Sequence, residues 1–296
     1  MISLRYAQRF IEGKGLNWND GHPVEGYSNL LWILGVSVFG RLGIDLILSV
    51  RILGILCSLA TIWFILDYFR TQNIKKEYVF LAITLLITTP CFAIWAIGGL
   101  EQPLYVLLVT LVLIEVIKII NDNNLNRIYK LSVWLGLLAL TRPDGFLFTI
   151  ITSIFLLFIN RNDKINFVKT AVATVVIPSL FLFSQLAFRY IYYGELVPNT
   201  ALVKVKITIH HILTGGLYNI YAFFGTLLIS LLGIYFLFLL VFKKKNLSGI
   251  YLLLNITAWI FYISMVGGDI FPAYRHYYVV LIFLIFSIIL GLNTHP

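Results

Sequence analysis

The chain has 296 residues, of which 60% are hydrophobic and 12% are charged, and its mean hydropathy is +0.92. This composition excludes an ordinary soluble globular protein and is typical of a protein with several membrane-spanning helices. The formal net charge of +9 does not indicate nucleic-acid binding, because the basic residues lie in short clusters between apolar runs, where membrane orientation explains them. Cys57 and Cys91 lie within or beside apolar segments without metal-type spacing, so we interpret them as inert core residues.

The first stretch, MISLRYAQRFIEGKG, predicts an amphipathic helix over residues 2–12. Its apolar residues recur at steps of three and four until Gly13 ends the pattern. We expect this helix to lie along the membrane surface rather than to cross the membrane. A secretory signal peptide is excluded, because the stretch lacks both an apolar run of about seven residues and a small-residue cleavage site.

The rest of the chain predicts an all-α polytopic membrane protein with about nine apolar helical segments. We predict one transmembrane domain over residues 1–296, in which residues 1–44 form an outer loop and residues 45–291 form the membrane helices. Residues 131–160 provide only about 45 Å of helix for two crossings of a core about 30 Å thick, so the TRPDG turn is expected below the outer surface. The nine segments cover residues 45–69, 78–97, 102–120, 131–141, 144–160, 167–191, 217–241, 249–266 and 276–291.

The loops between these segments differ in charge. One alternating set carries 12 of the 22 Lys and Arg residues, and the positive-inside rule assigns that side to the cytoplasm. The opposite side carries most of the acids, together with Gly, Pro, Tyr and Asn. The basic set is Arg70, Lys75, Lys76, Lys118, Arg127, Lys130, Arg161, Lys164, Lys169, Lys243, Lys244 and Lys245.

Ionisable residues at the outer helix ends are the candidates for function, because a charge at membrane depth costs at least about 2.5 kcal/mol. Arg142 and Asp144 flank Pro143, and this spacing fits either a local turn with its own ion pair or an arginine that binds an anionic head group. Asp269 and Arg275 fit either a local ion pair across a loop bent by proline or a role in binding, and the glycines before Asp269 favour close approach of a ligand.

Other candidates have equally plain structural explanations. Glu101 fits a residue at the water interface, and Glu25 fits a solvated acid in a loop. Trp18 and Trp32 flank the first outer loop, where aromatic residues serve either as membrane-interface anchors or as platforms for a sugar ring. We favour the anchor interpretation for both tryptophans.

Taken in order, seven stretches of the chain resemble the GT-C superfamily of polytopic glycosyltransferases. The resemblance is closest to the branch that includes the terminal arabinofuranosyltransferases of mycobacterial cell walls. No single stretch is diagnostic, and the ordered set carries the resemblance. The stretches are ISLRYA, EGKGLNWN, VEGYSNLLW, GGLEQPLY, LTRPDGF, YYGELVPNT and GGDIFPAYR, and they extend from residue 2 to residue 275.

The resemblance implies a transferase that moves a sugar from a polyprenyl-phosphate donor to a glycan or glycolipid acceptor of the cell envelope, with inversion, on the outer face of the bacterial plasma membrane. It also implies a second surface helix at about residues 28–42. No cofactor is implied, and the involvement of a divalent cation stays open. The residues implied in substrate binding are Glu25, Tyr27, Asn29, Glu101, Arg142, Asp144, Asn199, Lys204, Asp269 and Arg275.

In the GT-C family the acidic pair that supplies the general base comes directly before the stretch that matches ISLRYA. We therefore expect the base to lie just before Met1, on a spanning helix encoded by an upstream extension of the reading frame, and relatives commonly continue beyond the last apolar run as well. Two alternatives stay open. One is a transporter or flippase for a lipid-linked saccharide, which would place polar residues on broken helices near the middle of the membrane. The other is a non-catalytic fragment of the family.

Overall fold

The computed structural model describes residues 2–122, 124–198 and 208–294, and these residues form helices and connecting loops without a strand. The chain divides into two compact units by the contacts within each. Unit 1 contains Met1–Ser58, Ala96–Glu115 and Asn124–Lys206, and unit 2 contains Leu59–Trp95, Val116–Asn123 and Ile207–Pro296. Two long apolar helices, α3 (Leu46–Thr71) and α6 (Gln102–Asp122), each contribute their first part to unit 1 and their last part to unit 2.

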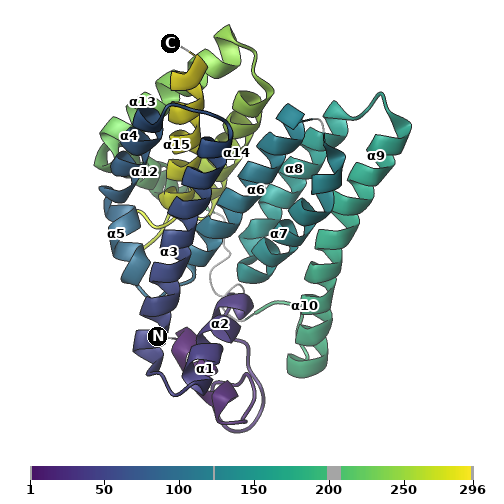
Figure 1. Ribbon diagram of the computed structural model, residues 1–296. Helices are drawn as coiled ribbons and strands as arrows, with labels where there is room; N and C mark the ends of the chain where they lie inside the picture. The colour runs from purple at the N-terminus through teal and green to yellow at the C-terminus, as the bar shows by residue number, and fades with distance from the viewer. Residues whose placement is uncertain (1, 123, 199–207, 295–296) are drawn as a thin grey trace. The chain divides into compact units, whose positions relative to one another are not determined.

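Unit 1 holds the two expected helices of the first loop and a set of apolar helices. Helix α1 packs against α2, and α7 packs against α2, α8 and α10 (Figure 1). The hydrophobic core under the first loop is formed by Tyr6, Tyr27, Trp32, Ile33 and Val36 with their neighbours. The elements are α1 (Ile2–Ile11), α2 (Leu30–Arg41), α3 (Leu46–Thr71, first part), α6 (Gln102–Asp122, first part), η1 (Leu125–Arg127), α7 (Ile128–Thr141), η2 (Pro143–Gly145), α8 (Phe146–Ile159), α9 (Lys164–Ala171), η3 (Val172–Val176) and α10 (Ile177–Tyr193).

Helix α1 exists where its periodicity predicts it, and it packs residues of both the apolar and the polar set of the sequence pattern against the rest of unit 1, among them Ala7, Leu4 and Phe10 of the apolar set. The helix ends before Gly13, whose positive φ of +76° favours glycine. Its buried residues are Ser3, Tyr6, Ala7 and Arg9, whereas Ile2 is 48% exposed. Ser3 and Arg9 are buried although they are polar, because their side chains hydrogen-bond to Asn29 and Asp20, so hydrogen bonding overrides local hydrophobicity at these two positions.

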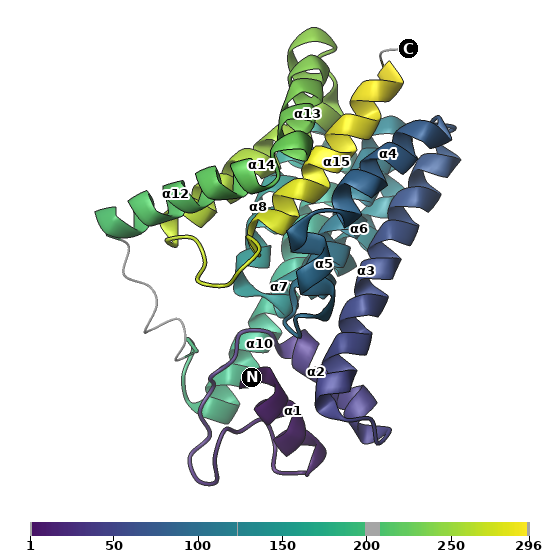
Figure 2. The ribbon, with the colours of Figure 1, turned by 90° about the vertical axis from the view of Figure 1, so that its left-hand side faces the viewer.

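Unit 2 is built around α15 (Tyr277–Thr294), which is apolar on all sides. A helix of this kind has to be covered all round or to face lipid, and here α4, α13 and α14 pack against it and bury most of its length (Figure 2). Helices α12 and α14 also pack against each other. The remaining elements are α4 (Lys76–Ile87), α5 (Pro90–Ile97), α12 (Ile209–Gly225), α13 (Leu227–Phe238), η4 (Leu239–Lys243) and α14 (Leu247–Met265), with the last parts of α3 and α6.

The helices fit an integral membrane protein, but the predicted count of nine spans is not confirmed. Among the described residues, 5 helices are long and apolar enough to cross a membrane, or up to 7 if each of two bent pairs counts as one span. Helices α7 and α8 have 14 residues each, about 21 Å at 1.5 Å per residue, and so are shorter than a core of about 30 Å. The segment 131–160 is therefore too short for two full crossings of the membrane, as its length predicts, and neither α7 nor α8 is counted as a separate span.

Both bent pairs belong to unit 2, apart from the last two residues of α5, Ala96 and Ile97. Helices α4 and α5 meet at 64°, and α12 meets the segment Leu227–Lys243 at 97°. The first break comes just before Pro90, whose missing N–H and ring interrupt the helical hydrogen bonds. The second falls at Thr226, whose hydroxyl donates to the carbonyl of Ala222 (2.7 Å).

Candidate functional site

Four of the predicted residues come together in unit 1 and form the Arg142 cluster, defined as Asn29, Glu101, Arg142 and Asp144. Glu101 directly precedes α6, and Arg142 and Asp144 belong to the turn between α7 and α8. The Arg142 guanidinium donates to Glu101 Oε1 from Nη1 (2.7 Å), to Asp144 Oδ2 from Nη2 (2.7 Å) and to Asp144 Oδ1 from Nε (3.0 Å). Asn29 donates from Nδ2 to Glu101 Oε2 (2.9 Å) instead of capping α2, which begins beside it.

The geometry of the Arg142 cluster favours the local ion-pair interpretation of Arg142. Two carboxylates share one guanidinium, so the three side chains carry a formal charge of −1, which repels a phosphate. The side chains of Glu101 and Asp144 are 6% and 5% exposed, and that of Arg142 is 13% exposed. Removing such charges from water is costly unless they are paired and hydrogen-bonded, as they are here. Binding of the donor phosphate by Arg142 stays a prediction.

A second buried pair in unit 1 joins Glu25 to Arg189 of α10. Arg189 Nε lies 3.0 Å from Glu25 Oε1 and 2.9 Å from Oε2, and both side chains are 5% exposed. Burial raises the pKa of Glu25 above its usual value, and the nearby Arg189 opposes this shift. Our sequence reasoning missed Arg189, although an arginine inside an apolar run is a signal in itself. Glu25 is therefore a buried, paired acid and not the solvated loop acid of the alternative interpretation.

Two aromatic candidates of the first loop are core residues. Tyr27 is 3% exposed, and its hydroxyl lies 3.1 Å from that of Tyr193. Trp32 is fully buried and donates from Nε1 to the carbonyl of Gly99 (3.3 Å). Neither ring offers a face to a sugar in this structure. Trp18 differs, because it is 41% exposed.

In unit 2, Asp269 and Arg275 form the third set. Arg275 donates to Asp269 Oδ2 from Nε (2.7 Å) and to Oδ1 from Nη2 (3.3 Å). The guanidinium also stacks over Phe271, with its carbon 4.6 Å from the ring centroid, and over Trp95 at 5.7 Å. Cation–π contacts of this kind hold an arginine in one orientation. The pair thereby fixes the Asp269 carboxylate, whose side chain is 5% exposed.

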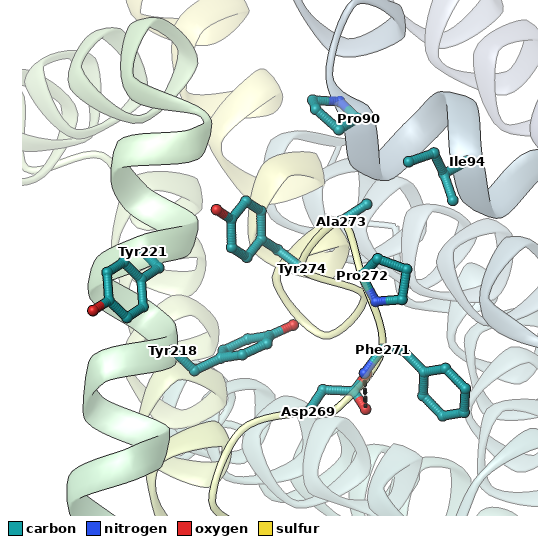
Figure 3. Close-up of a pocket in the computed structure, with 9 residues that line it drawn as sticks. All are labelled: Pro90, Ile94, Tyr218, Tyr221, Asp269, Phe271, Pro272, Ala273 and Tyr274. Carbon is teal, nitrogen blue, oxygen red and sulfur yellow. Dashed lines mark hydrogen bonds between the residues drawn. The ribbon is translucent and has the colours of Figure 1, made fainter.

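A cavity of about 470 Å³ lies beside Asp269, within the range of about 300–1,000 Å³ usual for small-molecule sites. We call it the Asp269 pocket. Figure 3 shows that α5 contributes Pro90 and Ile94 to it, that α12 contributes Tyr218 and Tyr221, and that the loop after α14 contributes the rest. The loop residues are Asp269, Phe271, Pro272, Ala273 and Tyr274. The pocket thus combines one carboxylate with several aromatic rings, and the two helices belong to the two bent pairs.

The loop that carries Asp269 has an unusual backbone. Ala273 and Tyr274 have φ values of +58° and +51°, a conformation that residues other than glycine rarely adopt. Such residues cost about 1–3 kcal/mol each and persist where the surrounding structure fixes them, often at binding sites. Here, the hydroxyl of Tyr218 accepts a hydrogen bond from the backbone N–H of His276 (3.1 Å), and Cys91 Sγ donates to the carbonyl of Tyr274 (3.6 Å).

Eight of the ten predicted residues can be placed, seven of them in three charged sets and Tyr27 apart from these sets, and the other two, Asn199 and Lys204, lie outside the described residues. Unit 1 contains the Arg142 cluster, the Glu25–Arg189 pair and Tyr27, and unit 2 contains Asp269 and Arg275. The sequence did not single out Tyr218 or Phe271, since an aromatic residue in an apolar helix or loop carries no local signal of function. No group of three or more His, Cys, Asp or Glu residues suited to a metal ion occurs within the described part of the chain.

Comparison with known proteins gives no assignment. No family model matches the chain, no curated protein matches it, and no solved structure matches it. The resemblance to the GT-C superfamily therefore depends on the quoted sequence stretches alone.

Proposed function

We propose that this chain is a membrane glycosyltransferase that moves a sugar from a polyprenyl-phosphate donor to a cell-envelope acceptor on the outer face of the membrane, with inversion. Three features support the proposal. The apolar helices fit an integral membrane protein, the ordered stretches resemble the GT-C superfamily, and the polar residues of those stretches gather into buried charged sets. Charged groups beside apolar helices are costly, so we treat these sets as candidates for function even where, as in the Arg142 cluster, the charges also pair with one another.

The Asp269 pocket is the observation that carries the proposal. A sugar presents hydroxyl groups together with apolar C–H faces, and this pocket presents a carboxylate together with aromatic rings. Arg275 already occupies both carboxylate oxygens, so we assign Asp269 to accepting hydrogen bonds from sugar hydroxyls through its remaining lone pairs. We do not assign it to proton abstraction.

The chemical step would proceed as follows. The hydroxyl oxygen of the acceptor attacks the anomeric carbon, and the bond from that carbon to the phosphate oxygen breaks. The polyprenyl phosphate leaves with the bonding electrons, and a base takes the proton of the hydroxyl. Attack from the side opposite to the leaving group inverts the configuration. Within this scheme Asp269 positions one of the two sugars.

The test is transfer from labelled polyprenyl-phosphate pentose and hexose donors, supplied separately with a membrane-lipid acceptor fraction to the full chain in proteoliposomes. We expect Asp269→Asn to lower the transfer rate about tenfold to a hundredfold, since one hydrogen bond to a charged group contributes about 1.5–3 kcal/mol. The matched control is Asp67→Asn, because Asp67 also pairs with an arginine in unit 2 but its side chain is 35% exposed. Equal transfer by the wild type and by Asp269→Asn contradicts the assignment of the pocket.

A transporter or flippase for a lipid-linked saccharide is the second candidate, and one observation favours it. Both bent helix pairs contribute to the Asp269 pocket, and transporters build their binding sites at discontinuous helices. The same proteoliposomes separate the two functions. Movement of the labelled donor across the bilayer, without a new glycosidic bond, supports the transporter. A new glycosidic bond supports the transferase.

A further inference from the structure

A second cavity lies in unit 1, between α1 and the loop that follows it, and has a volume of about 520 Å³. We call it the loop cavity. Its walls include two aromatic residues, Tyr6 and Trp18, and three polar residues, Asn19, Asp20 and His22. The Arg142 cluster and the Glu25–Arg189 pair use none of these five side chains. The loop cavity is therefore a separate feature of unit 1.

Tyr6 fixes the loop that forms the cavity. It is fully buried, its hydroxyl donates to the carbonyl of Val24 (2.6 Å), and the same hydroxyl accepts from the backbone N–H of Gly26 (2.7 Å). Arg5 adds a hydrogen bond from Nε to the carbonyl of Trp18 (3.2 Å). These contacts hold the backbone on both sides of the cavity. A site whose frame is fixed in advance loses less entropy when a ligand binds.

Trp18 supplies an exposed aromatic face on this frame. Its ring centroid lies 6.0 Å from that of Tyr6, at an interplanar angle of 48°, and the residue is 41% exposed. The indole is thus supported from one side and open on the other. A supported, open aromatic ring suits an apolar face of a ligand better than a flexible side chain does.

Asp20 supplies the main polar group of the cavity. Arg9 donates from Nη2 to Asp20 Oδ1 (2.5 Å), and the side-chain exposures are 4% for Arg9 and 88% for Asp20. This hydrogen bond lowers the pKa of Asp20, which keeps the carboxylate ionised at neutral pH. The rest of the carboxylate is open to solvent, so it is available to a donor on a ligand. A carboxylate at this position disfavours an anionic ligand.

We propose that the loop cavity binds a neutral saccharide, with one sugar ring stacked on Trp18 and with sugar hydroxyls donating to Asp20. Sugars combine C–H faces with hydroxyl edges, and the cavity combines an exposed indole with a carboxylate and an amide. Insertion of this surface into lipid is disfavoured, because the ionised Asp20 lies on the same rim. The proposal requires binding only and does not depend on sugar transfer. Where the proposed function holds, the cavity would receive the acceptor glycan.

The test measures binding of soluble trisaccharides to the full chain in detergent micelles by saturation-transfer NMR. The probes are arabinotriose, mannotriose and chitotriose. We expect each bound probe to have a Kd of about 1 mM, so concentrations up to about 10 mM suffice to approach saturation. We expect saturable binding of at least one probe. We expect Trp18→Ala and Asp20→Asn each to weaken it about tenfold, and Trp18→Phe to keep most of it.

The control variant is Trp63→Ala, since Trp63 is 58% exposed but belongs to α3 and not to the loop cavity. The hydrogen bond from Arg5 Nε to the backbone carbonyl of residue 18 does not depend on the side chain at that position, so every Trp18 variant can keep it. The thermal unfolding of each variant shows whether it folds. A wild type that binds none of the three probes overturns the proposal, as does equal binding by the wild type and Trp18→Ala. Failure of sugar transfer leaves this binding result untouched, so the two proposals fail separately.

Discussion

Replacing Arg142 with methionine tests whether the Arg142 cluster stabilises unit 1. The change removes four hydrogen bonds of 2.7–3.1 Å and leaves two carboxylates, 6% and 5% exposed, without their shared cation. Removing one partner of a buried ion pair typically costs about 3–5 kcal/mol, because the remaining charge stays uncompensated. We expect Arg142→Met to lower the free energy of unfolding by about that amount. Arg142→Lys should lose less, about 1–3 kcal/mol, since lysine keeps the charge but loses the planar fork.

Equilibrium unfolding in mixed detergent micelles, followed by circular dichroism, measures these changes. The triple variant Glu101→Gln, Arg142→Met, Asp144→Asn carries no charge at the cluster, so it should regain most of the loss. Arg70→Met is the matched control, because Arg70 pairs with Asp67 at 3.0 Å while its own side chain is 78% exposed, and such pairs contribute at most about 1 kcal/mol. Equal losses for Arg142→Met and Arg70→Met would refute the reasoning, and so would a triple variant as unstable as the single one.

Two further predictions concern pH and topology. Because burial raises the pKa of Glu25 above the ordinary value of 4.5, its contribution to stability is present below pH 4.5 and is lost as the pH rises through the folded-state pKa. Glu25→Gln should remove this part of a thermal unfolding profile measured against pH. The hydrogen bond from Lys14 lowers the pKa of Glu12, so Glu12 contributes stability that is lost as the pH falls through its folded-state pKa, and Glu12→Gln should remove that loss of stability. An unchanged stability profile in either variant contradicts the assignment for that residue. For topology, a single cysteine at Glu195 should react with a membrane-impermeant thiol reagent in intact cells and one at Lys244 should not, since basic loops face the cytoplasm; labelling of both positions would contradict the orientation.

The class of the protein could be predicted from the sequence because hydropathy is a local property. About 20 consecutive apolar residues suffice to fill the thickness of a bilayer, whatever they contact. The same local reasoning located α1 from its periodicity, and the sequence resemblance located α2. The predicted number of spans is not confirmed, because the lengths of α7 and α8 and the breaks at Pro90 and Thr226 depend on how the backbone bends in three dimensions.

The candidate polar residues could also be predicted, since a charge beside an apolar segment is conspicuous and costly. The partners that these residues bind in the folded chain could not be predicted. Glu101 is 41 residues from Arg142, and Glu25 is 164 residues from Arg189. Only packing between distant helices brings these groups together, and no pattern within a short window records it. The local pairs Arg142–Asp144 and Asp269–Arg275, which are 2 and 6 residues apart, were the exceptions that spacing alone suggested.

Burial was decided by the tertiary structure alone. Trp18 and Trp32 look alike in the sequence, yet one is 41% exposed and the other is fully buried beneath the first loop. Ser3 and Arg9 of α1 are buried because they find partners at Asn29 and Asp20. Hydrophobicity thus indicated an integral membrane protein, which the apolar helices of the described residues fit. Which side chains remain available to a ligand depended on close packing and on satisfying buried polar groups, and both are properties of the folded chain.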